Sequence, residues 1–459
     1  MRIHVAKPLF AWDCLEDSPS LKTIRDFLAS VPDAKLLDGL RTWRGKGRDD
    51  YPVSILWGTL LLTIGLRHTT IEGCLAELRR NEGLRQLVGI ESEDHVPKKW
   101  NMSRFLSLLG QEPHLSAMRA IFDQMLQRLG QVVADLGKNT AGDSTGLSAR
   151  RSEAVKEEIA SRGEDAVTDE NGLPLPSGGR KEYRDDSGKV TKILEWFGYK
   201  GHLLVDVKHE VILAYHVTST KTSDNDMIEP LIEQAKRNLP EDRIRTMAYD
   251  KAADDAAIHE LLDDHGIKPV IQIRSCWQNQ TEKLVPGQER RGNIVHDEAG
   301  TVFCYDTKSQ PPVRHKMAYT GHEPERSTLK YRCPAKHEGW SCPMSEICNA
   351  DKTYGLTVRV KQETDLRRFP PIPRATKKFE QLYNGRTSVE RVNSRLKVFW
   401  GTDDGNITGA ARFHAYFGAV MVVHAAFATL LAAAPRFGGV LGQTRLSTIS
   451  RALQKELTR

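Results

Sequence analysis

The sequence predicts an α/β protein with a mixed sheet flanked by helices, an all-helical N-terminal domain and an insertion before the last helices. Two observations support this prediction. Apolar residues at helical spacing dominate residues 50–130, and short strand-like runs alternate with helices from about 137 onward. The alternation breaks down after residue 273, and a strong helical pattern returns near 381. The expected segments are 1–130, 131–273, 274–380 and 381–459, of which the second and fourth form one sheet domain.

The composition is that of a folded, mildly basic protein. Of 459 residues, 39% are hydrophobic and 27% are charged, which is ordinary for a soluble chain long enough for two or three domains. The net charge of +6 permits a polyanionic partner without requiring one. Seven cysteines and a start without the apolar core of a secretory signal predict a reducing, cytoplasmic location.

The N-terminal helices are predicted from one wholly apolar run and two amphipathic runs. These are YPVSILWGTLLLTIGLR, TTIEGCLAELRRNEGLRQLVG and HLSAMRAIFDQMLQRLG. Between helical segments lie Lys98, Lys99 and Arg104. A small helical domain with basic edges is typical of a DNA-binding module. From these residues alone, a domain for oligomerisation or packing is equally compatible.

The sheet is predicted from runs that follow one another in a defined order. The first three elements in chain order are a strand (KNTAGDSTGLSA), a hairpin pair (ILEWFGYKGHLLVDVK with EVILAYHVTST) and a helix (SDNDMIEPLIEQAKRN). They are followed by a strand (RIRTMAYD), a helix (AADDAAIHELLDDHG) and a last strand (IKPVIQI). Three antiparallel strands that lead into parallel crossovers form a mixed sheet, and this is the strand order of an RNase H-like core. The polar residues 150–191 are expected to form a long surface insertion.

Two later segments depart from this pattern. Residues 274–380 are polar and contain several prolines and cysteines, so we interpret them as an insertion domain that interrupts the core. Residues 413–434, FHAYFGAVMVVHAAFATLLAAA, are apolar enough for a membrane span, but they include two histidines and no second span accompanies them. We expect a buried core helix there and no membrane contact.

Three carboxylates are candidate metal ligands. Asp143 lies in the first strand, Asp250 ends a later strand where open α/β sheets place ligands, and Glu390 lies on a late helix. Mg²⁺ prefers carboxylate oxygens, and two such ions support in-line phosphoryl transfer. Asp254 and Asp255 follow Asp250 closely, but helical turns should point them away from the strand end.

The third carboxylate belongs to the stretch YNGRTSVERVNSRLK. On one continuous helix, four polar side chains of this stretch would fall within about 60° of arc. They are Tyr383, Arg386, Glu390 and Lys397. Taken alone, this pattern also fits a solvated helix face. A helix boundary at Asn384 or Gly385 would place Tyr383 before the helix that carries the glutamate.

These residues resemble the bacterial insertion-sequence DDE transposases, in particular the group with a Y-x2-R-x3-E-x6-K signature. The four polar residues match that spacing without a gap. The runs GDSTGL and YDKAADDAAI resemble the two aspartate motifs of the family, and TSDNDMIEPLIEQA resembles the segment between them. The resemblance covers roughly residues 50–435.

The resemblance implies a specific activity. The three carboxylates would bind two Mg²⁺ or Mn²⁺ ions, cut double-stranded DNA at the terminal inverted repeats and join the 3′ ends to target DNA. The residues that hold DNA phosphates would be Tyr383, Arg386 and Lys397. Because two ends must be cut together, a homodimer on DNA is expected.

Further candidates lie near the signature and in the insertion. Lys377 and Lys378 end the basic run RRFPPIPRATKK, and we favour DNA contact over a solvated linker for this run. Arg391 is a further candidate for DNA contact. Four cysteines are candidate ligands of a structural zinc ion, although no pair has C-x2-C spacing and reduced packing cysteines are the alternative. They are Cys304, Cys333, Cys342 and Cys348.

Two other functions fit the same core. One is a domesticated relative that binds DNA without cutting it, and the other is a metal-dependent nuclease that hydrolyses DNA without strand transfer. The intact set of three carboxylates argues against the first.

Overall fold

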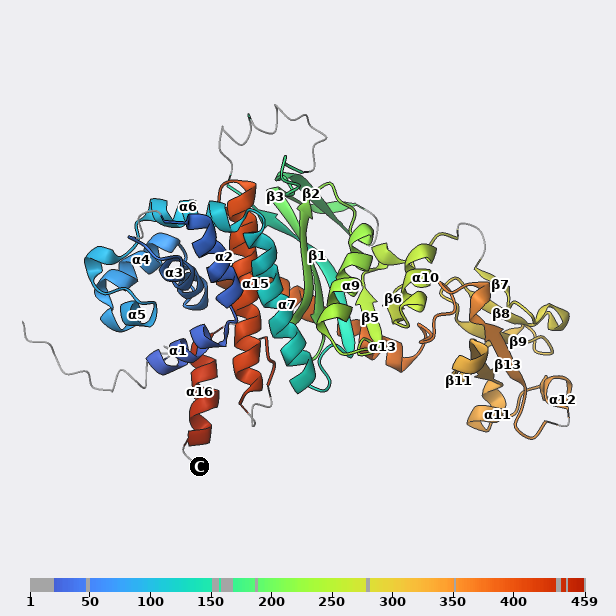
Figure 1. Ribbon diagram of the computed structural model, residues 1–459. Helices are drawn as coiled ribbons and strands as arrows, with labels where there is room; N and C mark the ends of the chain where they lie inside the picture. Colours follow the sequence, from blue (N-terminus) through green and yellow to red (C-terminus); the bar gives the residue numbers. More distant parts are fainter. Residues whose placement is uncertain are drawn as a thin grey trace, which may run out of the picture.

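The protein has three parts arranged along its long axis (Figure 1). The N-terminal helices lie at one end, a sheet flanked by helices lies in the middle, and a β-rich insertion lies at the other end. This is the α/β architecture that the sequence predicts. The computed structural model describes residues 20–46, 50–150, 157, 168–185, 189–277, 281–350, 352–434, 439–442 and 445–457.

The N-terminal part is helical. Its helices are α1 (Leu21–Ser30), α2 (Ala34–Arg44), α3 (Val53–Gly65), α4 (Ile71–Arg80), α5 (Glu82–Leu87), α6 (Lys99–Leu109) and α7 (His114–Val132). Helix α3 is buried almost throughout, as expected for a run without a polar face, because α2, α4, α6 and the C-terminal helix α15 pack around it. Helix α7 is amphipathic and packs against both α15 (Ala410–Ala432) and α9 (Ile228–Asn238), so it connects this part to the sheet domain.

The central sheet has the predicted mixed order. Its strands are β1 (Asn139–Ser148), β2 (Ser177–Arg184), β3 (Val190–Asp206), β4 (Ile212–Ser219), β5 (Thr246–Tyr249) and β6 (Lys268–Ile271). Strand β3 pairs antiparallel with β1 on one side and β4 on the other, whereas β5 and β6 continue from β1 in parallel. The crossover helices are α9 (Ile228–Asn238) and α10 (Ala256–Asp264). The sheet is therefore RNase H-like.

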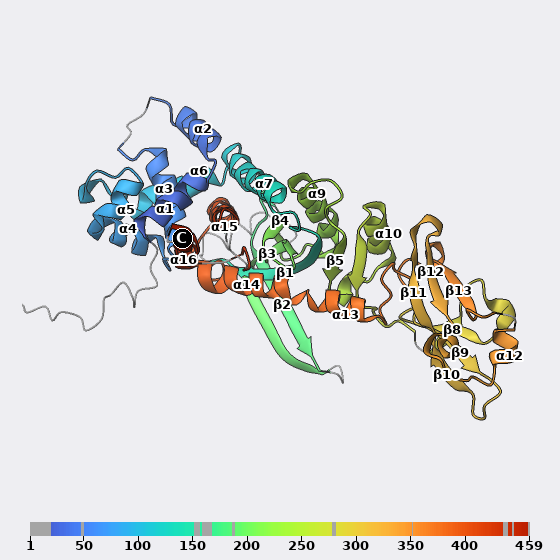
Figure 2. The ribbon, with the colours of Figure 1, turned by 90° about the horizontal axis from the view of Figure 1, so that it is seen from below.

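The segment expected to be a polar surface insertion contains a strand. Strand β2 pairs antiparallel with the first half of β3, from Ser177 opposite Gly198 to Arg184 opposite Val190. We call these two paired strands the arm. Figure 2 shows the arm projecting from the body of the protein on the side where α14 lies. The rest of the expected insertion lies largely outside the described residues.

The C-terminal helices complete the sheet domain. They are α13 (Lys377–Asn384), α14 (Thr387–Trp400), α15 (Ala410–Ala432) and α16 (Leu446–Leu457). Helix α14 packs against β1 and β3, on the opposite side of the sheet from α9 (Figure 2). Among the described residues, α15 alone is long and apolar enough to cross a membrane, yet 83% of its most apolar 18-residue segment is buried inside the protein. The prediction of a buried core helix is confirmed.

The insertion folds around a small core of its own. One sheet contains β7 (Glu282–Leu284), β8 (Ile294–Asp297), β9 (Val302–Asp306) and β10 (Val313–Lys316), and the other contains β11 (Ala318–Glu323), β12 (Thr328–Arg332) and β13 (Thr357–Lys361). Two short helices, α11 (Pro334–Glu338) and α12 (Ser345–Cys348), follow β12. Ile294, Leu329 and Val358 are fully buried in a cluster separate from the main core.

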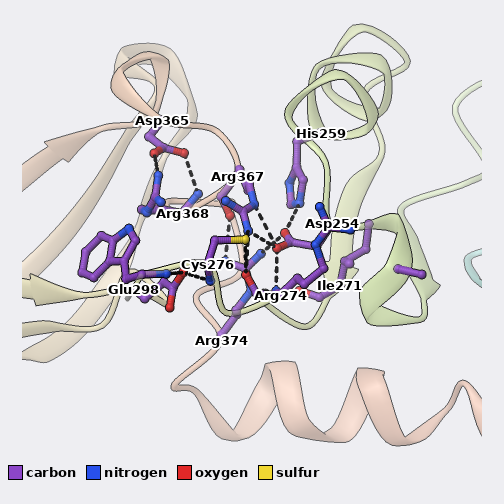
Figure 3. Close-up of polar contacts among 12 residues, drawn as sticks. Asp254, His259, Ile271, Arg274, Cys276, Glu298, Asp365, Arg367, Arg368 and Arg374 are labelled. Atoms are coloured by element: carbon purple, nitrogen blue, oxygen red, sulfur yellow. Dashed lines mark hydrogen bonds and ion pairs between the residues drawn. The ribbon is translucent and has the colours of Figure 1, made fainter. Parts of the chain in front are cut away.

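A buried carboxylate joins the insertion to the sheet domain (Figure 3). Asp254 precedes α10, and its carboxylate accepts hydrogen bonds from Arg367 at 2.7 Å and Arg374 at 3.3 Å, both from the segment that leaves the insertion. The backbone N–H of Arg274, which enters the insertion, donates at 2.7 Å, and His259 lies 3.3 Å away. We call these five residues the Asp254 cluster. Asp254 thus points away from Asp250 toward the junction, as its place after the strand suggests.

Candidate active site

Asp143 and Asp250 lie side by side where β5 ends. Strands β1 and β5 run parallel and pair Ala141 with Ala248. Asp143 comes two residues after Ala141 and is still within β1, and Asp250 comes two residues after Ala248, directly after β5. Since neighbouring strands are about 4.8 Å apart, the two aspartates are adjacent. Asp250 is also oriented locally, because its carboxylate accepts the backbone N–H of Ala252 at 2.8 Å.

The surroundings of Asp143 disfavour its charged form. Burial raises the pKa of this carboxyl to about 6, and the charge of Asp250 adds to the increase. The backbone N–H of Ser144 and the positive charges of Lys181 and Arg386 act in the opposite direction. A carboxylate that is partly desolvated beside another carboxylate gains most from a nearby cation. The pair is therefore suited to metal binding.

Two glycines permit close packing around this pair. A Cβ on Gly142 would lie 2.1 Å from the ring of Tyr249, so glycine alone lets that ring lie against β1 beside Asp143. A Cβ on Gly385 would lie 2.7 Å from the side chain of Val207 at the end of β3. Gly385 therefore allows the chain between α13 and α14 to approach the sheet closely.

Helix α14 contacts Asp143 one helical turn from Glu390. Asn393, one turn farther along this helix, donates from Nδ2 to Oδ2 of Asp143 at 3.3 Å. Residues three apart on a helix lie on the same face, so Glu390 lies one turn from this contact. Its carboxylate is exposed and forms an ion pair with Arg386 at 2.8 Å. Asp143, Asp250, Glu390 and Arg386 thus belong to one region.

The other residues of the signature lie in different environments. Tyr383 belongs to α13, where its ring stacks on Phe379 at 5.8 Å, so a helix boundary separates it from Glu390 as expected from the NGR run. Lys397 shares the helix face of Glu390 but lies seven residues, about 10 Å, farther along. Its ammonium is 3.3 Å from Asp403.

The remaining DNA candidates divide into two groups. Lys377 and Lys378 are exposed in the first turn of α13, where they are accessible to a polyanion. Arg391 instead donates at 2.6 Å to Glu210, a buried carboxylate in the β3–β4 turn that also pairs with Arg395. The structure therefore directs Arg391 away from the aspartates and into an internal ion pair.

The chemistry of the acidic residues suits a hard divalent cation. Asp143, Asp250 and Glu390 supply carboxylate oxygens only, which is the ligand type that Mg²⁺ and Mn²⁺ prefer. As the side chains stand, no three His, Cys, Asp or Glu groups within the described ranges are gathered around one point. Because Glu390 is exposed and paired with Arg386, its carboxylate would have to change partner in order to join the two aspartates.

The four candidate zinc ligands, all cysteines, pack against the same small core. Cys333 is buried, and the other three contact the cluster around it. Burial and the neighbouring thiols raise the pKa of Cys304 to about 12. The four side chains are not arranged as a metal site in the described structure. The zinc site remains a prediction that metal analysis tests: one zinc ion per purified chain would support it and none would contradict it.

Two residues near Asp143 were not predicted from the sequence. Lys181 lies on β2, whose Gly-rich polar sequence does not resemble a strand, and its charge acts on Asp143. Asn393 lies on α14, three residues after Glu390. The second could have been found from helical spacing, because i and i+3 side chains share a face.

The fold and this acidic pair define an RNase H-like protein whose carboxylates meet where β5 ends beside the middle of β1. The family model described as a transposase DDE domain matches residues 141–425, which is more than half of the chain. The chain belongs to this family of DDE transposases. Among curated proteins, none matches the sequence. One similar solved structure is a piggyBac transposase in a synaptic complex with hairpin DNA; it is 11% identical, with 96% of this chain and 82% of that chain covered and a TM-score of 0.34.

Proposed function

We propose that this transposase cuts double-stranded DNA at the terminal inverted repeats of a bacterial insertion sequence and joins the freed 3′ ends to target DNA. One observation carries the proposal: Asp143 on β1 lies beside Asp250 after β5, and α14 contacts Asp143 one helical turn from Glu390. Because two transposon ends take part, we further propose that a homodimer acts on the DNA.

Each residue of the site has a role in this reaction. Asp143, Asp250 and Glu390 would hold two Mg²⁺ or Mn²⁺ ions, which, when bound, activate the attacking water or 3′ hydroxyl and stabilise the leaving oxygen. Asn393 orients the carboxylate of Asp143 through its hydrogen bond. Arg386 would exchange its ion pair with Glu390 for a DNA phosphate, which releases the glutamate to complete the ligand set.

The proposal is tested with purified protein, a labelled duplex that carries the element end, and a target plasmid in Mg²⁺ or Mn²⁺. The expected products are strands cut at the element end and joined to the plasmid. Cleavage without joining would replace the proposal with the nuclease, and binding without cleavage would replace it with the domesticated relative. The end sequence is obtained from the inverted repeats that flank the coding region.

Replacing Arg386 with Gln should slow joining by about 10- to 100-fold. A hydrogen bond between charged groups is worth about 1.5–3 kcal/mol, and each 1.36 kcal/mol corresponds to a factor of about ten in rate. The measurement is the rate of joining at saturating DNA. The matched control is Arg391→Gln on the same helix, which we expect to leave the rate within about threefold because that guanidinium pairs with Glu210. Equal losses in both variants would contradict the role of Arg386.

A further inference from the structure

A polar cavity lies where the N-terminal helices meet the sheet domain. Its volume is about 240 Å³. From the helical part, α3, the start of α4 and α6 contribute Thr63, Thr69, Thr70, Glu72, Lys99 and Ser103. From the sheet domain come Arg150, which follows β1, the loop between α14 and α15, and Arg412 and Tyr416 on α15. Neither part forms this cavity without the other.

The walls of the cavity carry an excess of positive charge. Lys99, Arg150 and Arg412 line it together with one carboxylate, Glu72, which is already paired with Lys99 at 2.6 Å. Within the described part of the chain, no carboxylate pairs with either arginine. Arg412 is held in place by donating to Ser103 Oγ at 2.9 Å. Two guanidinium groups and several hydroxyls around a small space fit an oxyanion such as a phosphodiester.

The cavity is fixed in position relative to the catalytic aspartates. The loop after α14 is tied to the end of β1, since Ser148 N donates to Asp403 at 2.7 Å and Arg150 N donates to the carbonyl of Ile407 at 3.2 Å. Gly401 at the cavity wall comes eleven residues after Glu390 along α14, a rise of about 16 Å. Successive phosphates of one DNA strand advance by about 3.4 Å along the helix axis and also wind around it, so a separation of this size is spanned within a few nucleotides.

We propose that this cavity binds a backbone phosphate of the DNA strand that lies in the active site, a few nucleotides from the scissile bond. The inference rests on the proposed function and adds a second anchor to it. Phosphates at the two anchors would hold the N-terminal helices and the sheet domain on the same DNA. Lys397 lies on the intervening face of α14 and would follow the strand between them.

The test measures binding of the full chain to a 40-bp duplex of arbitrary sequence in EDTA, over a range of KCl concentrations. Each lost phosphate contact reduces the slope of log K against log salt by about 0.9. We expect Arg150→Gln/Arg412→Gln to reduce the slope by about 1–2. The matched control is Lys236→Gln/Arg237→Gln on the exposed surface of α9, across the sheet from α14, and its slope should stay close to that of the wild type.

The outcomes separate the cavity from the proposed function. An unchanged slope in the cavity variant, or an equal loss in the control, would overturn the phosphate site even if cleavage and joining persist. A wild-type protein that shows no salt-dependent binding and no cleavage would overturn the proposed function itself. Inorganic phosphate at matched ionic strength gives another comparison. If phosphate raises the melting temperature of the wild type, but the cavity variant keeps the wild-type slope of log K against log salt for DNA, the cavity binds free anions. That result would overturn the DNA assignment.

If Arg412→Gln disturbs folding through the loss of its bond to Ser103, a single variant keeps the inference falsifiable. Arg150 is exposed, so Arg150→Glu should fold normally. We expect it to weaken binding to the duplex more than Arg150→Gln does, because it places a carboxylate against the phosphate. A wild-type affinity in Arg150→Glu would overturn the proposal.

Discussion

If the proposed function is right, we expect that replacing Asp143 with Asn sharply slows cleavage and joining while leaving DNA binding largely intact. The substitution keeps the shape of the side chain and its contact with Asn393 but removes the negative charge beside Asp250. Loss of a metal ligand removes several kcal/mol of transition-state stabilisation, so the rate should fall by about 10³-fold or more. The measurement is joining of a labelled end duplex, with binding followed in parallel. A variant that joined DNA at the wild-type rate would show that Asp143 is not a ligand.

The same substitution should make the metal-free protein more stable at pH 7. Because the folded-state pKa of Asp143 is raised to about 6, the folded protein binds this proton more tightly than the unfolded chain between about pH 4 and 6. The wild type therefore loses stability as pH rises through this window, and Asn does not. At about 1.36 kcal/mol per pKa unit, the gain at pH 7 should be about 1–3 kcal/mol and should vanish near pH 4.

Chemical denaturation in EDTA at pH 7 and pH 4 measures this difference. The matched control is Asp135→Asn, because hydrogen bonds from Lys208 and His209 lower the pKa of Asp135. A depressed pKa contributes stability above the unfolded value, so the control should be less stable than the wild type at pH 7. If both variants were destabilised at pH 7, the environment inferred for Asp143 would be wrong.

The central sheet could be predicted because its strands and helices have clear apolar periods. Each run from β3 to β6 is bounded by turn residues and is strongly apolar on at least one face. Strand β2 was missed because SGGRKEYR has no alternating apolar residues; it forms by pairing with β3. The strands of the insertion are also short and form by long-range pairing, which local sequence does not reveal.

The positions of the two aspartates followed from the strand order, but the partners of the basic residues did not. Arg391 pairs with Glu210, which is 181 residues away in sequence and adopts a positive φ of 54° in the β3–β4 turn. No local pattern announces such a contact. The same holds for Lys397, whose partner Asp403 lies in the loop after α14. Helical spacing indicates which side chains share a face, whereas the partner across that face depends on the tertiary structure.

Replacing Asp254 with Asn should lower the free energy of unfolding by about 3–5 kcal/mol, because breaking a buried ion pair leaves its partner charge uncompensated. The side chain of Asp254 is fully buried and that of Arg374 is 4% exposed, so neither charge can turn to solvent. Burial alone would raise the pKa of Asp254, but hydrogen bonds from His259, Arg367 and the N–H of Arg274 outweigh it and lower the pKa to about 2. The carboxylate is thus charged at pH 7, and its contribution is lost as pH falls from about 4 to 2.

The neighbouring residue provides the control for this prediction. Asp255 caps α10 by accepting the N–H of Ala257 at 2.9 Å, and Asp255→Ala should cost about 1 kcal/mol. Urea denaturation compares the two variants, and limited proteolysis locates the effect. The Asp254 cluster joins the two connecting segments, one that enters the insertion and one that leaves it. Its loss should therefore expose residues 272–277 to proteolytic cleavage before the sheet itself unfolds. Equal stabilities of the two variants would show that Asp254 does not hold the insertion in place.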